Sequence, residues 1–340
     1  MPEELRKYAT VLHTPMETLN AGAKNITEAL SKYVEARGIM VSNDEIRRLF
    51  ASLCASRVIV IRTSDALGAR LTLRAMSECL GFNSTFVNVN PEDERISFSS
   101  SDNSMGIVNA VNVAIEQPEK PALAIICGKE FDDVCEFMGD VMSYSGLGTT
   151  EYRIAMGQDK ERSFKLPANM WFIVLVSDEV NVRTGNACVT AIHATFNKLI
   201  NVNAVALGLG EEKTTLHMYP MTQRILADTV AREREENYLS ESYWRKIDRL
   251  EEYLAGKVGF AVGNKTVNAM EKYVSVCIAA GSDREDAMDA LISSMLLPAL
   301  TFDDAKALDG DETLTEFMDS LCGADKDDRC REILRLKGIK

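Results

Sequence analysis

A short turn between an apolar strand and an amphipathic helix contains the residues of this sequence that could do chemistry. The stretch VIVIRTSDALGARLTLRAM (residues 58–76) starts apolar, passes through Thr63, Asp65 and Gly68, and then takes on a helical pattern. Turns of this layout hold the phosphates of nucleotides in many proteins, because backbone N–H groups at the start of the helix point at the anion. The stretch therefore predicts either a phosphate loop or the scaffold of one.

Histidines and cysteines offer little other chemistry. His13, His193 and His217 are far apart in the sequence, so a metal or nucleophile site based on histidine is not expected. No CxxC pair occurs, and most cysteines lie in apolar segments, so we expect free buried thiols and no metal site. The eight cysteines are Cys54, Cys79, Cys127, Cys135, Cys188, Cys277, Cys322 and Cys330.

A second stretch, GLGEEKTT at residues 208–215, has nearly the spacing of a phosphate loop. It carries Glu212 where that loop needs a glycine. Two acidic side chains beside the phosphates would oppose binding, so we interpret this stretch as a surface loop.

Composition limits the class of protein. The chain has 340 residues, of which 46% are hydrophobic and 26% charged, with a net charge of −13. That balance is typical of a globular protein, and the acidic charge argues against direct nucleic-acid binding. No apolar run reaches the roughly 18 residues of a membrane span. We therefore predict a cytoplasmic protein that does not bind a membrane.

The elements around the turn predict an α/β fold with a mostly parallel sheet. Short apolar runs alternate with helical patterns, and runs without polar alternation suit strands that are buried on both faces. The predicted strands are residues 58–61, 84–89, 122–127, 170–176 and 198–203. Trp171, in the fourth of these, and Trp244, in a helical pattern, are expected to be core or interface anchors.

Helical patterns dominate both ends of the chain. We predict an N-terminal helical segment over residues 1–40, an α/β core over 41–215 and a helical domain with acidic C-terminal helices over 216–340. Capping boxes are expected where Ser42 precedes Glu45 and where Ser282 precedes Glu285.

Several phrases, in order between about residues 37 and 300, resemble the McrB-type branch of AAA+ proteins. They are ARGIMVSNDEIRRLFASLCASRVIVI, VNVNPED, EQPEKPALAII, KLPANMWFIVLV and DALISSMLLPAL. The resemblance implies a three-layer AAA+ core with a P-loop-like turn, a small all-α lid, ring assembly and a setting in prokaryotic antiviral defence.

The resemblance also implies where a phosphate loop should place its functional groups. The first glycine position falls on Thr63 and the lysine position on Ala69, while Gly68 is retained. The Mg²⁺-binding hydroxyl position falls on Arg70. Asp65 adds a negative charge where phosphates would lie. The lysine and the hydroxyl that phosphoryl transfer needs are therefore missing.

Other positions implied by the resemblance are changed as well. The acidic pair that follows the third strand falls on Cys127 and Gly128, and the polar sensor on Ser177. No arginine lies between Arg183 and Arg224, where a neighbour-directed arginine finger is expected. The lid sensor falls on Lys265, the one match that keeps its charge.

Taken together, these losses predict a degenerate member, a pseudo-ATPase. We expect no catalytic residue, no metal and no cofactor, so the chain is not expected to be an enzyme. Its role would be structural or regulatory, through protein–protein interaction with an active NTPase or effector subunit, and it would be a monomer or small oligomer alone. The alternative is a divergent NTPase that uses Arg70 and Lys265 in place of the usual lysine.

Overall fold

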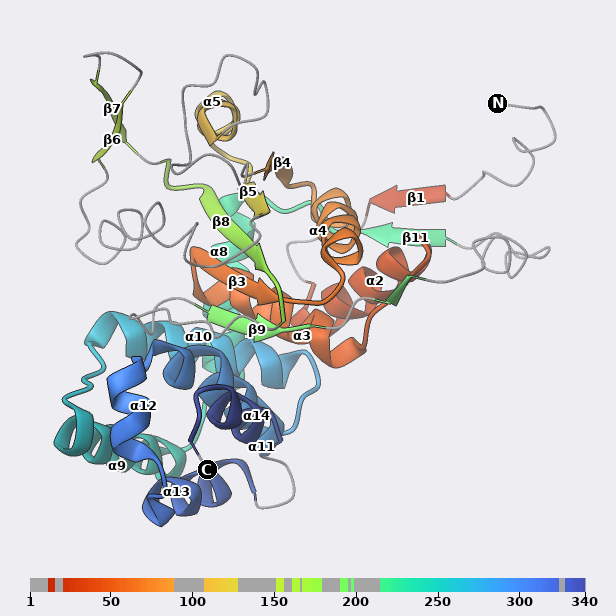
Figure 1. The fold of residues 1–340 in the computed structure, drawn as a ribbon. Coiled ribbons are helices and arrows are strands. Elements are labelled where there is room, and N and C mark those ends of the chain that lie inside the picture. Colours follow the sequence, from red (N-terminus) through yellow and green to blue (C-terminus); the bar gives the residue numbers. More distant parts are fainter. Residues whose placement is uncertain are drawn as a thin grey trace.

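The structure is a computed structural model that describes most of the chain. The described residues are 12–15, 21–88, 107–127, 151–155, 161–165, 167–178, 190–194, 197–198, 215–323 and 328–339. Figure 1 shows a sheet flanked by helices and, beside it, a cluster of C-terminal helices. Within the described ranges, no helix has both the length and the apolar composition that a membrane crossing requires.

Five parallel strands form the central sheet, in the order β4-β5-β8-β3-β9. Their bounds are β3 (Val58–Arg62), β4 (Asn83–Asn88), β5 (Ala122–Cys127), β8 (Met170–Val176) and β9 (Thr190–His193). In register, Ile59 of β3 lies opposite Ile173 of β8 and Thr190 of β9. Because all five strands are parallel, their carboxyl ends share one edge of the sheet and their amino ends share the other.

Burial explains why these segments are strands. Every residue of β3 and of β8 is buried. Side chains alternate between the two faces of a strand. Ile59 and Ile61 accordingly join the main hydrophobic core, whereas Val58 and Val60 are buried on the other face. Strands covered on both faces give the uninterrupted apolar runs from which they were predicted.

Helices cover both faces of this sheet. The α/β part contains α2 (Ala23–Glu35), α3 (Asn43–Ala55), α4 (Ala66–Leu80) and α5 (Ile107–Glu116). Helix α4 connects β3 to β4, and α5 connects β4 back to β5. These right-handed crossovers run in opposite directions along the sheet, so α4 and α5 lie on opposite faces. Helix α3 begins at the predicted box, where the Ser42 hydroxyl accepts a hydrogen bond from the Glu45 N–H at 3.1 Å.

The C-terminal region is helical, as predicted. It contains α8 (Gln223–Glu236), α9 (Glu241–Val258), α10 (Asn264–Ala279), α11 (Arg284–Leu291), a π-helical turn η1 (Ile292–Leu296), a 3-10 turn η2 (Leu297–Ala299), α12 (Phe302–Leu308), α13 (Glu312–Cys322) and α14 (Asp328–Leu336). Helix α10 packs against α3 and α8, and η1 contacts β9. Helices α9 to α14 therefore lie on the β9 side of the sheet (Figure 1).

A buried ion network joins the helical region to α3. Asp289 of α11 is fully buried, and every residue from Ala287 to Leu300 is buried around it. Arg329 of α14 donates hydrogen bonds to Asp289 Oδ2 and to Asp44 Oδ2, each at 2.7 Å. The backbone N–H of Cys330 donates to Asp289 Oδ1 at 3.1 Å. One guanidinium thus connects α14, α11 and the first turn of α3.

A second buried carboxylate connects α8 to α2. Helix α2 begins after Gly22, which has no side-chain cap of its own. Glu233 of α8, 4% exposed, accepts a hydrogen bond from the Ala23 N–H at 3.0 Å. A carboxylate at this position satisfies an unpaired N–H and lies at the positive end of the helix dipole. The sequence gives no local sign of this cap, because its partners are 210 residues apart.

Three predictions about strands and helices need correction. Residues 12–15 form β1 (Leu12–Pro15), a strand within the segment predicted to be helical, and it pairs in parallel with β11 (Thr215–Met218). The fifth strand of the sheet is β9, which was not predicted. Of the predicted strand 198–203, only Lys198 is described, in β10 (Asn197–Lys198), which pairs with β2 (Ile39–Met40). These segments are strands because they pair with segments far away in the sequence, and such pairing cannot be predicted from local apolar periodicity. The domain boundary after residue 215 stays a prediction, since β11 spans it.

Two smaller features also differ from expectation. Strands β6 (Glu151–Ala155) and β7 (Glu161–Lys165) form an antiparallel hairpin that the apolar pattern did not predict. Helix α11 is capped by Asp283, whose carboxylate accepts a hydrogen bond from the Asp286 N–H at 2.8 Å, and not by Ser282. Asp and Ser are comparable N-caps, so the predicted start of this helix was one residue too early.

Removing the Asp289 carboxylate should destabilise the fold strongly. Asp289→Ala would leave Arg329 facing the buried α11 without that partner, a loss that costs about 3–5 kcal/mol. The matched control is Asp319→Ala, which breaks a 3.1 Å pair with Arg331 whose side chains are 38% and 44% exposed. That control should cost under about 1 kcal/mol. Urea denaturation measures both, and equal losses would contradict the role assigned to Asp289.

Candidate functional site

The turn between β3 and α4 lies at the carboxyl edge of the sheet. It contains only residues 63–65, since β3 ends at Arg62 and α4 begins at Ala66. The Thr63 N–H donates to the Val176 carbonyl at 3.0 Å, and the Asp65 N–H donates to Thr63 Oγ1 at 3.1 Å. Thr63 is 3% exposed. The turn is therefore short and held in place by its own hydrogen bonds.

Asp65 is the N-cap of α4. Its Oδ1 accepts a hydrogen bond from the Gly68 N–H at 2.8 Å. In a phosphate loop, free N–H groups at the helix N-terminus bind the anion, and the helix dipole favours a negative charge there. Here a carboxylate of the chain itself takes that position. A phosphate would have to displace it and would meet its negative charge.

The positions aligned with the phosphate-loop lysine and hydroxyl lie inside α4. Ala69 is fully buried in the core. Arg70 is half-buried, and its guanidinium carbon lies 5.1 Å from the centroid of the Phe86 ring of β4. Gly68 is buried in the first turn of the helix. The residues aligned with the end of a phosphate loop therefore form the start of a helix and not an open loop.

Cys127 and Ser177 end neighbouring strands beside this turn. Cys127 is the last residue of β5 and lies opposite Leu175 of β8. Burial raises the pKa of Cys127, and the nearby positive charge of Arg70 opposes that shift. The thiol is therefore neutral near pH 7, which makes it a poor ligand for Mg²⁺. The Ser177 hydroxyl lies 3.5 Å from Asp178 Oδ1. Gly128 lies outside the described residues, as do residues 208–214 of the second loop-like stretch.

Lys265 lies in a helix whose N-terminus is beyond the opposite, amino edge of the sheet. It is the second residue of α10, which runs antiparallel to α3. The charges of Asp44 and Arg48, near the start of α3, act on Cys277 late in α10, whereas Lys272 lines a hollow with the last residues of α3. Helix α3 leads into the amino end of β3. The N-terminus of α10 is therefore beyond the amino edge, and the structure does not bring Lys265 to Asp65.

Arg62 is a site residue that sequence reasoning missed. It ends β3, is 3% exposed, and its Nη2 donates to the Asp178 carbonyl at 2.7 Å. Its Nε has no hydrogen-bond partner in the described part of the chain. Burial lowers its pKa, while the charges of Glu332 and Asp178 oppose that shift. The sequence did contain a signal for this residue, since Arg62 is a charged residue directly after the apolar run VIVI.

One group of side chains has the elements of a metal site. The ligand atoms of Asp289, Cys322 and Cys330 all lie within 4.8 Å of one another, and all three residues are buried. Asp289, however, already binds Arg329 and the Cys330 N–H through its two oxygens. A cation placed there would also lie close to the Arg329 guanidinium, so this group is better explained as part of the ion network.

Comparison with known proteins supports the fold and gives no activity. Residues 219–337 match a family described as a domain of unknown function, DUF8727. No curated protein matches the sequence. A crystal structure from Cytophaga hutchinsonii, described as a candidate ATPase, aligns with a TM-score of 0.53 and 11% identity over 93% of this chain and 98% of that chain. The C-terminal region of NrS-1, at 13% identity over 83% and 70% of the two chains, has a TM-score of only 0.26.

These comparisons complete the assignment of the fold. A TM-score above one half over almost the whole of both chains shows a shared architecture, although 11% identity shows nothing further. Together with the parallel five-stranded sheet and the C-terminal helices, it confirms the predicted fold class at the level of architecture: an α/β core with a mostly parallel sheet, followed by a small all-α region, the lid.

Removing the Asp65 cap should weaken α4 measurably. Asp65→Ala leaves the Gly68 N–H without its acceptor and should cost about 1 kcal/mol in the free energy of unfolding. Asp65→Asn keeps an acceptor oxygen and should cost less. Urea denaturation of the three proteins measures this order. An unchanged Asp65→Ala would mean that the carboxylate does not hold the helix start.

Proposed function

We propose that this chain is a nucleotide-independent, AAA+-like module that acts as a structural or regulatory subunit of a larger assembly. The observation that carries the proposal is the hydrogen bond from the Gly68 N–H to Asp65. This bond fills the place where an AAA+ protein would bind the phosphates of a nucleotide. The fold is kept, while the anion position is occupied by the protein itself.

The residues around the turn support the same reading. Phosphoryl transfer depends on a cation at the phosphates, a metal with its ligands and a group that orients the attacking water. Ala69 is buried, Cys127 is a neutral thiol, and the three-residue turn offers no open loop. Because such groups act as a unit, losing several of them removes far more rate than losing one.

The alternative, a divergent NTPase, needs Arg70 and Lys265 to act on one phosphate chain. Arg70 lies over Phe86 near the carboxyl edge. Lys265 is the second residue of α10, whose N-terminus lies beyond the amino edge. The two positions therefore belong to opposite edges of the sheet. This separation favours the nucleotide-independent function.

A protein partner would then carry the chemistry. The resemblance to McrB-type proteins suggests an active NTPase or effector subunit, in a prokaryotic defence system. Analogy of fold is the only support for that setting. The acidic charge of −13 disfavours direct binding to nucleic acid, which leaves protein–protein contact as the mode of action.

Nucleotide should not be hydrolysed by the protein and should not bind at the β3–α4 turn. A ligand raises the melting temperature only if it binds the native state, and the Asp65 cap leaves no phosphate clamp at this turn. Any change in melting temperature with millimolar ATP, ADP or GTP and Mg²⁺ should therefore be the same in Arg70→Ala as in the unsubstituted protein, and neither protein should turn nucleotide over. Turnover that disappears in Arg70→Ala would establish the divergent NTPase instead.

A homomeric ring should not form without a partner. In an AAA+ ring, nucleotide lies at the subunit seam and helps to close it, and here that anchor is lost. Each added subunit also brings a charge of −13. Size-exclusion chromatography with light scattering, at micromolar protein and without nucleotide, should give a monomer or small oligomer. A stable hexamer would contradict the idea that losing the nucleotide site loosened the ring.

A further inference from the structure

A hollow of about 310 Å³ lies at the amino edge of the sheet, opposite the turn described above. Its walls are the end of α3, the start of β8, and the facing sides of α8 and α10. The lining residues are Leu53, Cys54, Ala55, Ser56, Arg57, Trp171, Gln223, Leu226, Ala227, Val230, Ala231, Arg234 and Lys272. None of these is acidic, although the whole chain carries a charge of −13.

Three cations line this hollow. Arg234 pairs with Glu271 and donates to Asn268 Oδ1 at 2.9 Å. The side chains of Arg57 and Lys272 have no hydrogen bond or ion pair within the described residues. In that part of the chain, two of the three positive charges therefore have no counter-ion.

The two cations lie in different surroundings. Arg57 is exposed as a whole, and its guanidinium carbon lies 3.7 Å from the centroid of the Trp171 ring, a favourable cation–π contact, while desolvation by that contact lowers the pKa of Arg57. Burial also lowers the pKa of Lys272, and the charges of Arg234 and Arg57 act in the same direction. An anion bound between Arg57 and Lys272 would offset the desolvation of both side chains and the repulsion between their charges.

The dipole of helix α3 does not account for both cations. Helix α3 ends at Ala55, and its last residues line the same hollow. The C-terminal end of a helix is equivalent to roughly half a negative charge, whereas Arg57 and Lys272 supply two positive charges. A net positive charge of more than one unit remains.

We propose that this hollow binds a small phosphorylated molecule between the core and the helical lid. A phosphate monoester carries about 1.5–2 negative charges near pH 7, which matches the two unpaired cations. The volume is at the lower end of the range for small-molecule pockets. The apolar sides of Leu226 and Val230 offer a surface to the rest of the ligand.

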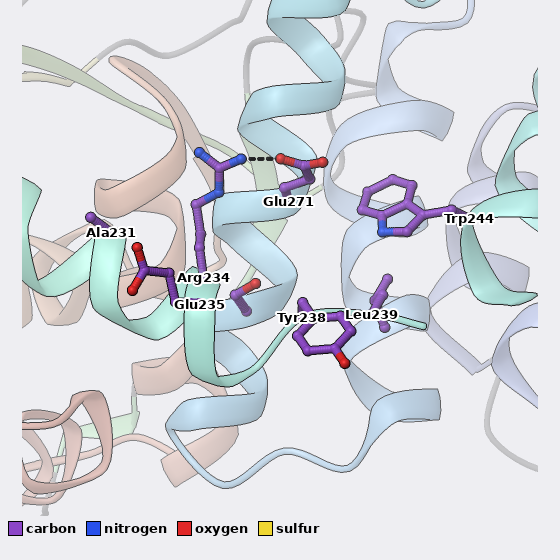
Figure 2. Close-up of a pocket in the computed structure, with 8 residues that line it drawn as sticks. Ala231, Arg234, Glu235, Tyr238, Leu239, Trp244 and Glu271 are labelled. Atoms are coloured by element: carbon purple, nitrogen blue, oxygen red, sulfur yellow. Dashed lines mark hydrogen bonds and ion pairs between the residues drawn. The ribbon is translucent and has the colours of Figure 1, made fainter. Parts of the chain in front are cut away.

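The ligand would act as a bridge. Arg57 belongs to the core, and Lys272 to the lid helix α10. A second hollow, of about 350 Å³, adjoins the first and shares Ala231 and Arg234 with it. Figure 2 shows this second hollow, in which Arg234 turns toward Glu271 while Tyr238 and Trp244 lie further along the lid. A ligand with a longer organic part could extend from the first hollow into the second.

Calorimetric titration of the full chain with inorganic pyrophosphate tests the proposal. Pyrophosphate should bind, and Lys272→Gln or Arg57→Gln should each weaken its affinity by about tenfold or more, the effect of losing one charged hydrogen-bond donor. The control Arg245→Gln removes the same charge from α9, where the side chain is 69% exposed. It should leave the affinity unchanged.

A second measurement separates a binding role from a structural one. Lys272→Met removes an uncompensated, half-buried charge, so without ligand it should melt at the same temperature as the unsubstituted protein or higher. The same variant should lose the rise in melting temperature that pyrophosphate causes. Failure of pyrophosphate to bind, or equal binding by Lys272→Gln and Arg245→Gln, would overturn the proposal.

Further titrations identify the source of the phosphate. AMP and glucose 6-phosphate are compared with pyrophosphate, and stronger binding of either organic phosphate would support a contribution from the apolar wall. Binding to this hollow should be insensitive to Arg70→Ala. Nucleotide binding that Arg70→Ala abolishes and Lys272→Gln does not would refute the proposed function and leave this inference standing.

Discussion

A carboxylate in the buried run of residues 287–300 is the constraint on which the rest of the structure depends. Asp289 lies in the run from Ala287 to Leu300, where no residue is exposed. An unpaired charge there would be costly, so Arg329 must reach it, and the same guanidinium also binds Asp44. Satisfying one buried charge therefore fixes α14 and α11 against the start of α3.

Fixing α3 in turn positions both edges of the sheet. Helix α3 is followed directly by β3, and α10 packs antiparallel along it. The ion network lies at one end of this pair of helices, and the hollow with Arg57 and Lys272 lies at the other. The Asp289 network would thus hold the first turn of α3 to α11 and α14, and a ligand in the hollow would connect the last turn of α3 to α10.

The turn after β3 is held by the packing around it. Strand β3 is buried along its whole length, and α4 buries one side against the core, neither of which depends on a ligand. Because Asp65 caps α4, the helix start is satisfied without an anion. The strand, the turn and the helix are therefore stable without a ligand. Arg62, buried at the end of the same strand, donates a hydrogen bond to the Asp178 carbonyl. The charge of Glu332 in α14 also acts on it, so the lid lies near the carboxyl edge of the sheet at this point.

The sequence by itself determined the features that depend on neighbours a few residues away. Apolar runs located four of the five strands of the central sheet, and the Ser42 box located the start of α3. The residue types after β3 led to the prediction of a degenerate phosphate loop, which stays a prediction. Only the tertiary structure decided which distant groups meet. Asp44 and Arg329 are 285 residues apart, and Glu233 caps a helix that begins 210 residues earlier. Strands β1 and β11 pair across a similar distance, and Arg57 and Lys272 converge from the core and the lid. Periodicity and capping act within one or two turns of chain, whereas these contacts depend on how whole elements pack.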